Sequence, residues 1–197
     1  MISARQADES TTDKREAILS AALELFSERG YHGTAVPLVA EKANVGAGTL
    51  YRYFESKEAL VNALYRHWKM EFGKALIESF PTETMGPRQQ FSELARRLWQ
   101  FGEKHRKALM FLEMHHHADY LDEESRLLEA TILGRIVDFV ASEPTRQALK
   151  PLPPRTLIAI VLGGFLGVIK AVQTGEVEPG PQTFAAAETC LWEAVRA

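Results

Sequence analysis

The sequence has little of what marks secreted, disulfide-bonded or membrane-spanning proteins. A single cysteine, Cys190, excludes an internal disulfide and any metal cage of several cysteines, and fits a reducing cytoplasm. The first 12 residues are polar and lack the apolar core of a signal peptide. The longest apolar run, 157–169, has 13 residues, fewer than the roughly 20 that cross a bilayer. We therefore expect a cytoplasmic protein without a membrane partner.

An excess of positive charge is also missing. The chain has 23 basic and 26 acidic residues, a net charge of −3, so the molecule as a whole does not attract nucleic acid. Any affinity for DNA must come from a local group of residues. The segment 42–57 is such a group, because it carries Lys42, Arg52 and Lys57 against the single acidic Glu55.

Familiar catalytic motifs are absent as well. The sequence contains no Gly-x-Ser-x-Gly elbow, Walker loop, dinucleotide fingerprint or paired-cysteine motif, so we expect neither an enzyme nor a cofactor. An alternative is a helical metal-binding enzyme that uses His115, His116 and His117. Successive helical residues turn by about 100°, so these three side chains cannot all ligate one ion. We therefore predict no metal site and interpret them as partly buried histidines or, as the second alternative, as the polar lining of an otherwise apolar pocket.

What the sequence does contain is a helical pattern through most of its length. Apolar residues recur at steps of three and four, and strand-like alternation is nearly absent, which predicts an all-α fold. After a flexible arm over 1–12, the first helix should begin near Asp13 and end at Gly30. Further helices are expected over about 35–43, 47–54, 56–80, 88–104, 106–118, 123–141, 155–174 and 181–195.

The two short helices over 35–43 and 47–54 form a candidate helix-turn-helix. Asn44 can adopt the left-handed conformation of a tight turn, and Gly46 can cap the second helix. In that helix Leu50 and Phe54 anchor one face inward. The other face is small at Gly48 and Thr49 and polar at its end, which suits insertion into a major groove. The residues that crowd its end are Tyr51, Arg52 and Tyr53.

Lys57 lies in the first turn of the next helix, where its charge opposes the helix dipole. This placement costs roughly 0.3–1 kcal/mol unless something negative offsets it, and a DNA phosphate would do so. The plainer reading is that Lys57 is only solvated and that Tyr51 and Tyr53 are half-buried packing residues. Periodicity alone does not decide between the two.

At these positions the sequence resembles the TetR/AcrR family of transcriptional regulators, over about 13–64. The resemblance implies a three-helix helix-turn-helix DNA-binding domain (13–58) and a C-terminal helical effector-binding and dimerisation domain (59–197). It also implies a ligand-responsive repressor that a small-molecule effector releases from a palindromic operator. The residues that carry it are Leu25-Phe26, Gly30-Tyr31, Gly33-Thr34, Ala40, Val45, Gly48-Thr49-Leu50-Tyr51, Tyr53-Phe54 and Ser56-Lys57-Glu58-Ala59-Leu60.

The resemblance assigns roles within the helix-turn-helix. Ala47, Gly48 and Arg52 would lie at or beside base edges, and Arg52 is the side chain best able to read guanine. Two departures from the family pattern imply altered affinity: Asn44 replaces a turn glycine, and Gly46-Ala47 replaces a more polar pair. The residues that would meet the phosphate backbone are Thr34, Thr49, Tyr51, Tyr53 and Lys57.

The second half resembles the family only in length and helicity. Its last two helices look like the pair that joins two subunits in a homodimer, and the less favoured alternative is that they are the core of one chain. The expected interface residues are Leu162, Phe165, Leu166, Ile169, Phe184, Leu191 and Trp192. A small apolar or aromatic effector would be held by flexible and aromatic side chains, for which the candidates are Trp68, Phe72, Trp99, Met110, Met114, His117, Phe139 and Phe165.

Overall fold

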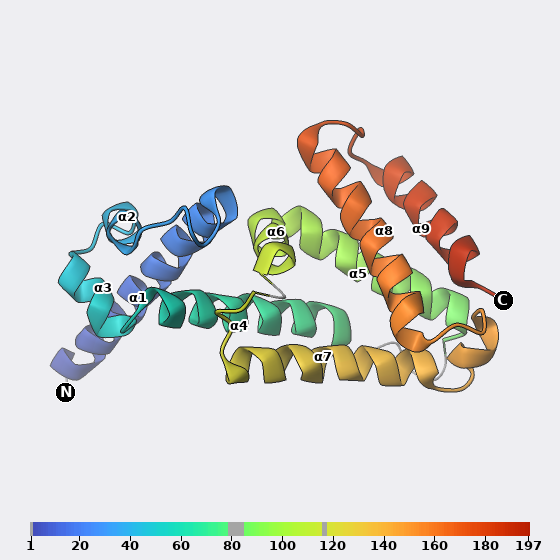
Figure 1. The fold of residues 1–197 in the computed structure, drawn as a ribbon, viewed down its shortest axis with the longest axis horizontal. Coiled ribbons are helices and arrows are strands. Elements are labelled where there is room, and N and C mark those ends of the chain that lie inside the picture. Colours follow the sequence, from blue (N-terminus) through green and yellow to red (C-terminus); the bar gives the residue numbers. More distant parts are fainter. Residues whose placement is uncertain (1, 79–84, 116–117) are drawn as a thin grey trace. The chain divides into compact units, whose positions relative to one another are not determined.

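The computed structural model describes residues 2–78, 85–115 and 118–197, with only the backbone described over 2–12. Within these residues the chain is helical and contains no strand, which confirms the all-α prediction (Figure 1). The helices are α1 (Ile2–Arg29), α2 (Val36–Lys42), α3 (Ala47–Tyr53), α4 (Lys57–Ile77), α5 (Pro87–Lys104), α6 (Arg106–His115), α7 (Glu123–Ala141), the 3-10 helix η1 (Thr145–Ala148), α8 (Pro154–Thr174) and α9 (Pro181–Val195).

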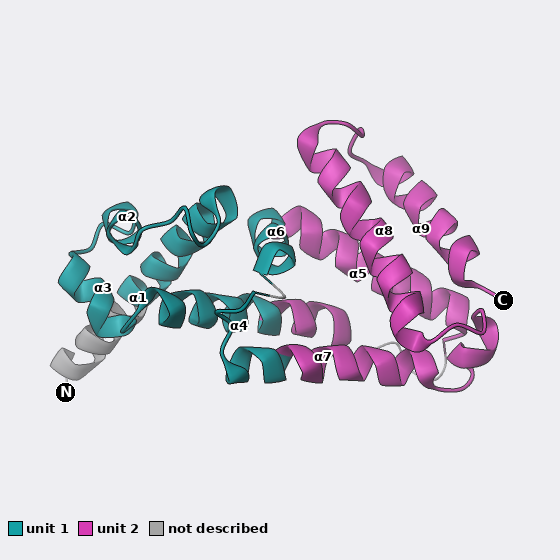
Figure 2. Ribbon diagram, in the orientation of Figure 1, with its two compact units in different colours: residues 1–70, 106–128 teal, residues 71–105, 129–197 magenta. Residues whose placement is uncertain are grey.

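The chain forms two compact units, coloured separately in Figure 2. Unit 1 comprises residues 1–70 and 106–128, and unit 2 comprises 71–105 and 129–197. Two of the three dividing points fall inside α4 and α7 and the third lies between α5 and α6, so the compact units do not coincide with the domains 13–58 and 59–197. That division by domain stays a prediction, as does the flexible arm over 1–12. The expected start of the first helix near Asp13 is wrong, because α1 begins at Ile2.

Unit 1 is organised around the apolar face of α1. Ile18, Ala22, Leu25 and Phe26 recur at helical spacing and are all at most 5% exposed. α1 packs against α2 and α6, and α2 packs against α3. This packing fixes the short helices α2 and α3, which are too short to be stable on their own.

Two left-handed residues make the turns of unit 1. Gly30 has φ +67° and ends α1, and Asn44 has φ +54° between α2 and α3. An asparagine tolerates this conformation because its short polar side chain bonds locally. Both turns agree with the sequence prediction.

Unit 2 is held together by α5, α8 and α9, each of which packs against the other two. Leu149, Leu157 and Val195 form a buried cluster beside the C-terminus. Arg88 of α5 makes a two-pronged salt bridge to Glu188 of α9, whose side chain is 9% exposed. Such a bidentate pair fixes geometry as well as contributing charge attraction.

Candidate functional site

The short helix α3 exposes one face and buries the other. Leu50 is fully buried and Phe54, just after the helix, is 4% exposed, so both anchor α3 to unit 1 as the sequence predicted. Ala47, Gly48, Tyr51 and Arg52 are exposed. These four positions follow the helical period i, i+1, i+4, i+5 and therefore share one face.

This exposed face of α3 has a definite shape. A Cβ added at Gly48 would meet no atom within 4 Å, so the first turn is low and open. Tyr51 is 50% exposed at the other end, beside the exposed Arg52. The face thus offers a smooth N-terminal part followed by hydrogen-bonding groups. Thr49 and Tyr53 flank it and are half-buried.

Lys57 begins α4 and lies over an aromatic ring. Its ammonium is 4.2 Å from the centre of the Tyr31 ring, a cation–π contact. Ser56 precedes it as the expected cap, accepting a hydrogen bond from the Ala59 backbone N–H at 3.0 Å. Glu58 adds a negative charge in the first turn. The charge of Lys57 is therefore already offset within the chain, so the helix-dipole argument does not by itself require a phosphate there.

Two residues of the predicted DNA surface form hydrogen bonds or salt bridges within the chain instead. Thr34 is 1% exposed, and its hydroxyl donates to the backbone oxygens of Leu25 and Gly30. Its one proton is therefore unavailable to a phosphate. Lys42 forms a 2.6 Å salt bridge with Glu24, whose hydrogen bond raises the pKa of Lys42. Of the three basic residues that the sequence singled out, Arg52 is exposed and Lys57 is half-buried.

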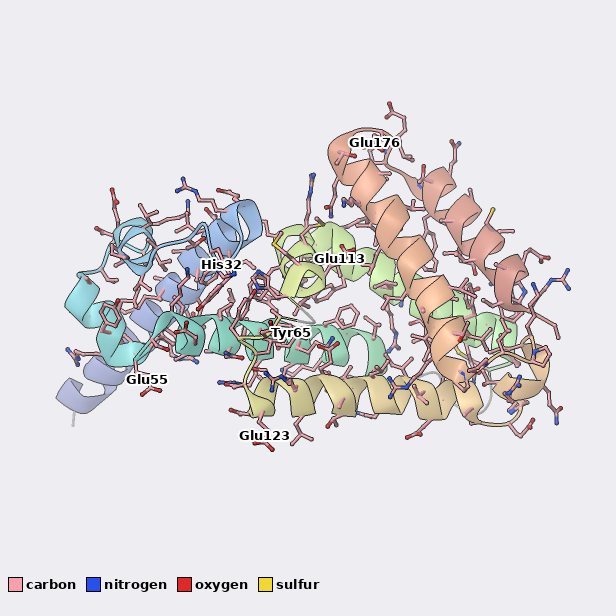
Figure 3. The ribbon with its side chains drawn as sticks, in the orientation of Figure 1. His32, Glu55, Tyr65, Glu113, Glu123 and Glu176 are labelled. Atoms are coloured by element: carbon pink, nitrogen blue, oxygen red, sulfur yellow. The ribbon has the colours of Figure 1, made fainter. Side chains whose placement is uncertain are left out.

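One basic residue beside this surface was missed from the sequence. The guanidinium of Arg15 in α1 lies 5.6 Å from the centre of the Phe54 ring, next to the end of α3. No spacing rule links residues 15 and 54, so only the fold reveals this neighbour. Glu55, labelled in Figure 3, is exposed at the same end of α3 and opposes these positive charges.

Unit 2 contains an apolar cavity of about 140 Å³. Apart from Thr145 and the indole of Trp192, its described lining side chains are all hydrocarbons. Thr145 is itself 5% exposed and its hydroxyl reaches Gln90 Oε1 at 3.4 Å. The full lining is Phe72, Leu76, Ile77, Pro87, Phe91, Leu94, Ala95, Leu98, Ile136, Phe139, Val140, Thr145, Leu149, Leu157, Ile158, Val161, Leu162, Phe165, Trp192 and Val195.

The cavity includes part of the effector set expected from the sequence. Phe72, Phe139 and Phe165 line it. Trp99 does not, and instead packs on Phe184 with ring centres 5.5 Å apart. Three of the remaining candidates, Trp68, Met110 and Met114, belong to unit 1, and His117 lies outside the described residues.

The expected dimer residues of α8 and α9 face mostly into unit 2. Phe165 is fully buried and Ile169 is 6% exposed. Leu162 and Trp192 line the cavity, and Phe184 lies against Trp99. Leu191 packs so closely that a Cβ on Gly164 would come 2.4 Å from its Cδ2 atom. Leu166 is half-buried.

A different face of the pair α8 and α9 is open. Apart from Ile160 it consists of small residues, which a prediction based on large apolar side chains does not include. By length and composition α8 could also cross a membrane, although its unbroken apolar run, 157–169, is shorter than the roughly 20 residues that a membrane-spanning helix needs. The exposed residues of this face are Ala159, Ile160, Gly163 and Gly167 on α8 and Ala185, Ala186, Thr189 and Cys190 on α9.

The histidine cluster gives no metal site in the described part of the chain. There, no three His, Cys, Asp or Glu residues are arranged to hold an ion. His115 is fully buried, and its Nδ1 is hydrogen-bonded to the hydroxyl of Tyr120. Desolvation lowers the pKa of His115 to about 4, so the ring is neutral at pH 7. His116 and His117 lie outside the described residues.

Comparison with known proteins agrees with this arrangement. Residues 18–64 match the family model of bacterial regulatory proteins of the tetR family, and 65–197 match a tetracyclin repressor-like C-terminal domain. The HTH-type transcriptional regulator RutR of Escherichia coli K12 is 34% identical over 151 residues, which cover 75% of this chain and 70% of RutR.

Solved structures share the fold. A TetR-family regulator from Marinobacter aquaeolei VT8 superposes with a TM-score of 0.83 over 98% of both chains at 22% identity. FadR of Bacillus subtilis, solved with stearoyl-CoA, has a TM-score of 0.67 and 19% identity, covering 90% of this chain and 95% of that one. The two family models together span most of this sequence. The chain belongs to the TetR family of DNA-binding transcriptional regulators.

Proposed function

We propose that this regulator is a repressor that binds a palindromic DNA site as a homodimer and leaves it when a small apolar molecule fills the cavity. The observation that carries the proposal is the exposed face of α3, low at Gly48 and ending in Tyr51 and Arg52. A helix with a smooth first turn and polar groups at its end fits a major groove. As a DNA regulator it would act in the bacterial cytoplasm.

In this proposal the residues of α3 divide into two kinds of contact. Ala47 and Gly48 allow a close approach to base edges, and Arg52 donates two hydrogen bonds to a guanine. Thr34 is left out, because its hydroxyl is used inside unit 1. The residues that meet phosphates and set the register are Thr49, Tyr51, Tyr53 and Lys57.

A homodimer is part of the proposal because one short helix reads few base pairs. Two recognition helices reach successive major grooves when they are roughly 34–36 Å apart, which requires a palindromic site. The open small-residue face of α8 and α9 suits a symmetric contact, because Gly163 and Gly167 let a partner helix approach closely. A second subunit that packs on this face would also cover the exposed apolar residues of α8.

The cavity suggests the chemical class of the effector. Its hydrocarbon lining gives a charged or strongly polar molecule no compensating partner, so such a ligand would lose its hydration without return. Cavities of roughly 150 Å³ lined by Leu, Ile and Phe stay dry and bind benzene. A molecule that fills this space and binds better to a dimer whose recognition helices are wrongly spaced shifts the population away from the DNA-binding form.

The DNA contacts are tested with a labelled duplex that the wild-type chain selects from a random-sequence pool. Replacing Arg52 by alanine should cost about 1–3 kcal/mol and relax the preference at one base position. Lys57→Ala should weaken binding to all sequences and reduce the salt slope by about 1. Lys74→Ala is the matched control. Lys74 is an exposed lysine of the same helix, lies toward its C-terminal end and forms a salt bridge with Glu71.

The same titrations would contradict the proposal in two ways. If the chain selects no sequence, or if neither Arg52→Ala nor Lys57→Ala changes its affinity, the chain does not use α3 and α4 to bind DNA.

The effector site is tested with benzene as the first probe, followed by toluene and indole. Saturating benzene should raise the thermal midpoint of the wild type and not that of Phe165→Trp, in which the cavity is filled.

A further inference from the structure

Tyr31 contacts the first turn of α4 in two ways. Its ring lies under the Lys57 ammonium, and its hydroxyl donates a hydrogen bond to the Glu58 carboxylate. That bond holds the pKa of Glu58 below its usual value, so the acceptor stays ionised near pH 7. The position of the Tyr31 ring therefore determines where the Lys57 ammonium is held.

Tyr31 is in turn held by a residue distant in sequence. The Tyr120 ring stacks on it with ring centres 4.0 Å apart and planes 21° from parallel. Tyr120 belongs to the segment 118–122 that follows α6, and both residues lie in unit 1. We call this pair the Tyr31–Tyr120 stack. Through it, the segment after α6 contacts the residue that supports Lys57.

Asn62 fixes this segment to α4. The amide nitrogen of Asn62 donates to the backbone oxygens of Glu58 and Tyr120 at 2.9 and 2.8 Å. Its amide oxygen accepts from the Asp122 N–H and the Ser125 hydroxyl, both at 2.9 Å. All four hydrogen-bonding positions of this 2%-exposed amide are used. The segment cannot shift without breaking these hydrogen bonds.

The far end of the stack reaches the last residue of α6. The Tyr120 hydroxyl is hydrogen-bonded to Nδ1 of the buried His115, which lies against Phe26 and Phe111. The other ring nitrogen of His115, Nε2, has no hydrogen-bond partner among the described atoms. A continuous set of contacts thus runs from the end of α6 to the Lys57 ammonium.

We infer that Tyr120 is a positioning residue for DNA binding, which acts through Tyr31 to present Lys57 to a phosphate. The inference rests on the proposed contact between Lys57 and DNA. Without the Tyr120 ring, Tyr31 loses the surface that fixes it, and Lys57 samples more orientations before it binds. Tyr120 touches no DNA in this scheme, and its effect depends on Lys57.

A double-mutant cycle tests the dependence, with the full-length chain and the selected duplex described above. Tyr120→Ala should weaken binding about two- to fivefold, the range for one exposed cation–π contact. The salt slope should stay close to that of the wild type, because Lys57 is still present and still neutralises its phosphate once bound. In the Lys57→Ala background, Tyr120→Ala should have no further effect. Tyr120→Phe keeps the ring and should bind like the wild type.

The outcomes separate this inference from the proposed function. Equal losses from Tyr120→Ala with and without Lys57, or no loss in a folded Tyr120→Ala variant, overturn the role of Tyr120 alone. If Lys57→Ala leaves affinity and salt slope unchanged, both the phosphate contact and the inference fall. Should Tyr120→Ala prove unfolded by circular dichroism, Tyr120→Leu takes its place, since it fills space without an aromatic face.

Discussion

The buried His115 should make the stability of the chain depend on pH in a defined window. Burial lowers its pKa to about 4 in the folded chain, whereas an unfolded histidine titrates near 6.5. Between pH 6.5 and 4, His115 is therefore protonated in the unfolded chain and neutral in the folded chain. The free energy of unfolding therefore falls as the pH drops from about 6.5 to 4 and levels off below that.

The two pKa values set the size of the effect. Linkage between them gives a loss of about 2 kcal/mol at pH 5 and about 3 kcal/mol at pH 4, relative to neutral pH. Tyr120, the hydrogen-bond partner, stays protonated throughout, because burial raises its pKa. Carboxylates such as Glu93, whose pKa is lowered to about 2 by bonds from Arg96 and Arg97, contribute at lower pH. Burial also lowers the pKa of His105, so His105 contributes in the same window as His115 and only a variant that lacks His115 separates the two.

Urea unfolding at pH 7.5, 6 and 5 is the assay, at one fixed protein concentration because the proposed dimerisation would add to stability. His115→Gln is the reference, since glutamine can keep a hydrogen bond to Tyr120 but does not titrate. Between pH 7.5 and 5 the wild type should lose about 2 kcal/mol more than this variant. Equal losses in the two proteins would show that His115 is not held neutral by burial, and the reasoning would fail.

Three further predictions follow from packing. Asn62→Ala leaves partly buried backbone groups of Tyr120 and Asp122 without their Asn62 partner and should cost about 1–3 kcal/mol in urea unfolding. Gly164→Val drives a side chain into Leu191 and should cost about 1–3 kcal/mol by the same measurement. Gly163→Ala meets no neighbour in one chain and should favour the helix by up to about 1 kcal/mol, yet weaken dimerisation in sedimentation. Unchanged dimerisation would place the interface elsewhere.

The sequence predicted helices well where apolar periodicity and turn residues agreed. The range 123–141 matches α7, Gly30 ends α1 as expected, and Asn44 takes the left-handed conformation expected of it. The exposure of α3 was predictable too, because Leu50 and Phe54 define an inward face that leaves Tyr51 and Arg52 outside. Local rules suffice when the partner of a residue lies within one or two helical turns.

Contacts between residues far apart in the sequence could not be predicted from it. Nothing in the spacing shows that Lys42 pairs with Glu24, that Thr34 bonds inside its unit, or that Tyr120 stacks on Tyr31. The dimer candidates were chosen for size, and large apolar residues such as Phe165 are those that a single chain buries first. The small residues left outside carry a weaker signal, so the open face of α8 and α9 was missed.

The hydrocarbon lining of the cavity has a consequence for what such a regulator can distinguish. Without directional partners, recognition depends on how much volume a guest fills, and each added methylene that fits is worth about 0.8 kcal/mol, close to a fourfold gain in affinity. Once the space is full, one more carbon meets packed walls and affinity drops. A homologous series of guests would then give a peak at one size, and the gene under control would respond to a molecular dimension shared by many compounds rather than to one compound.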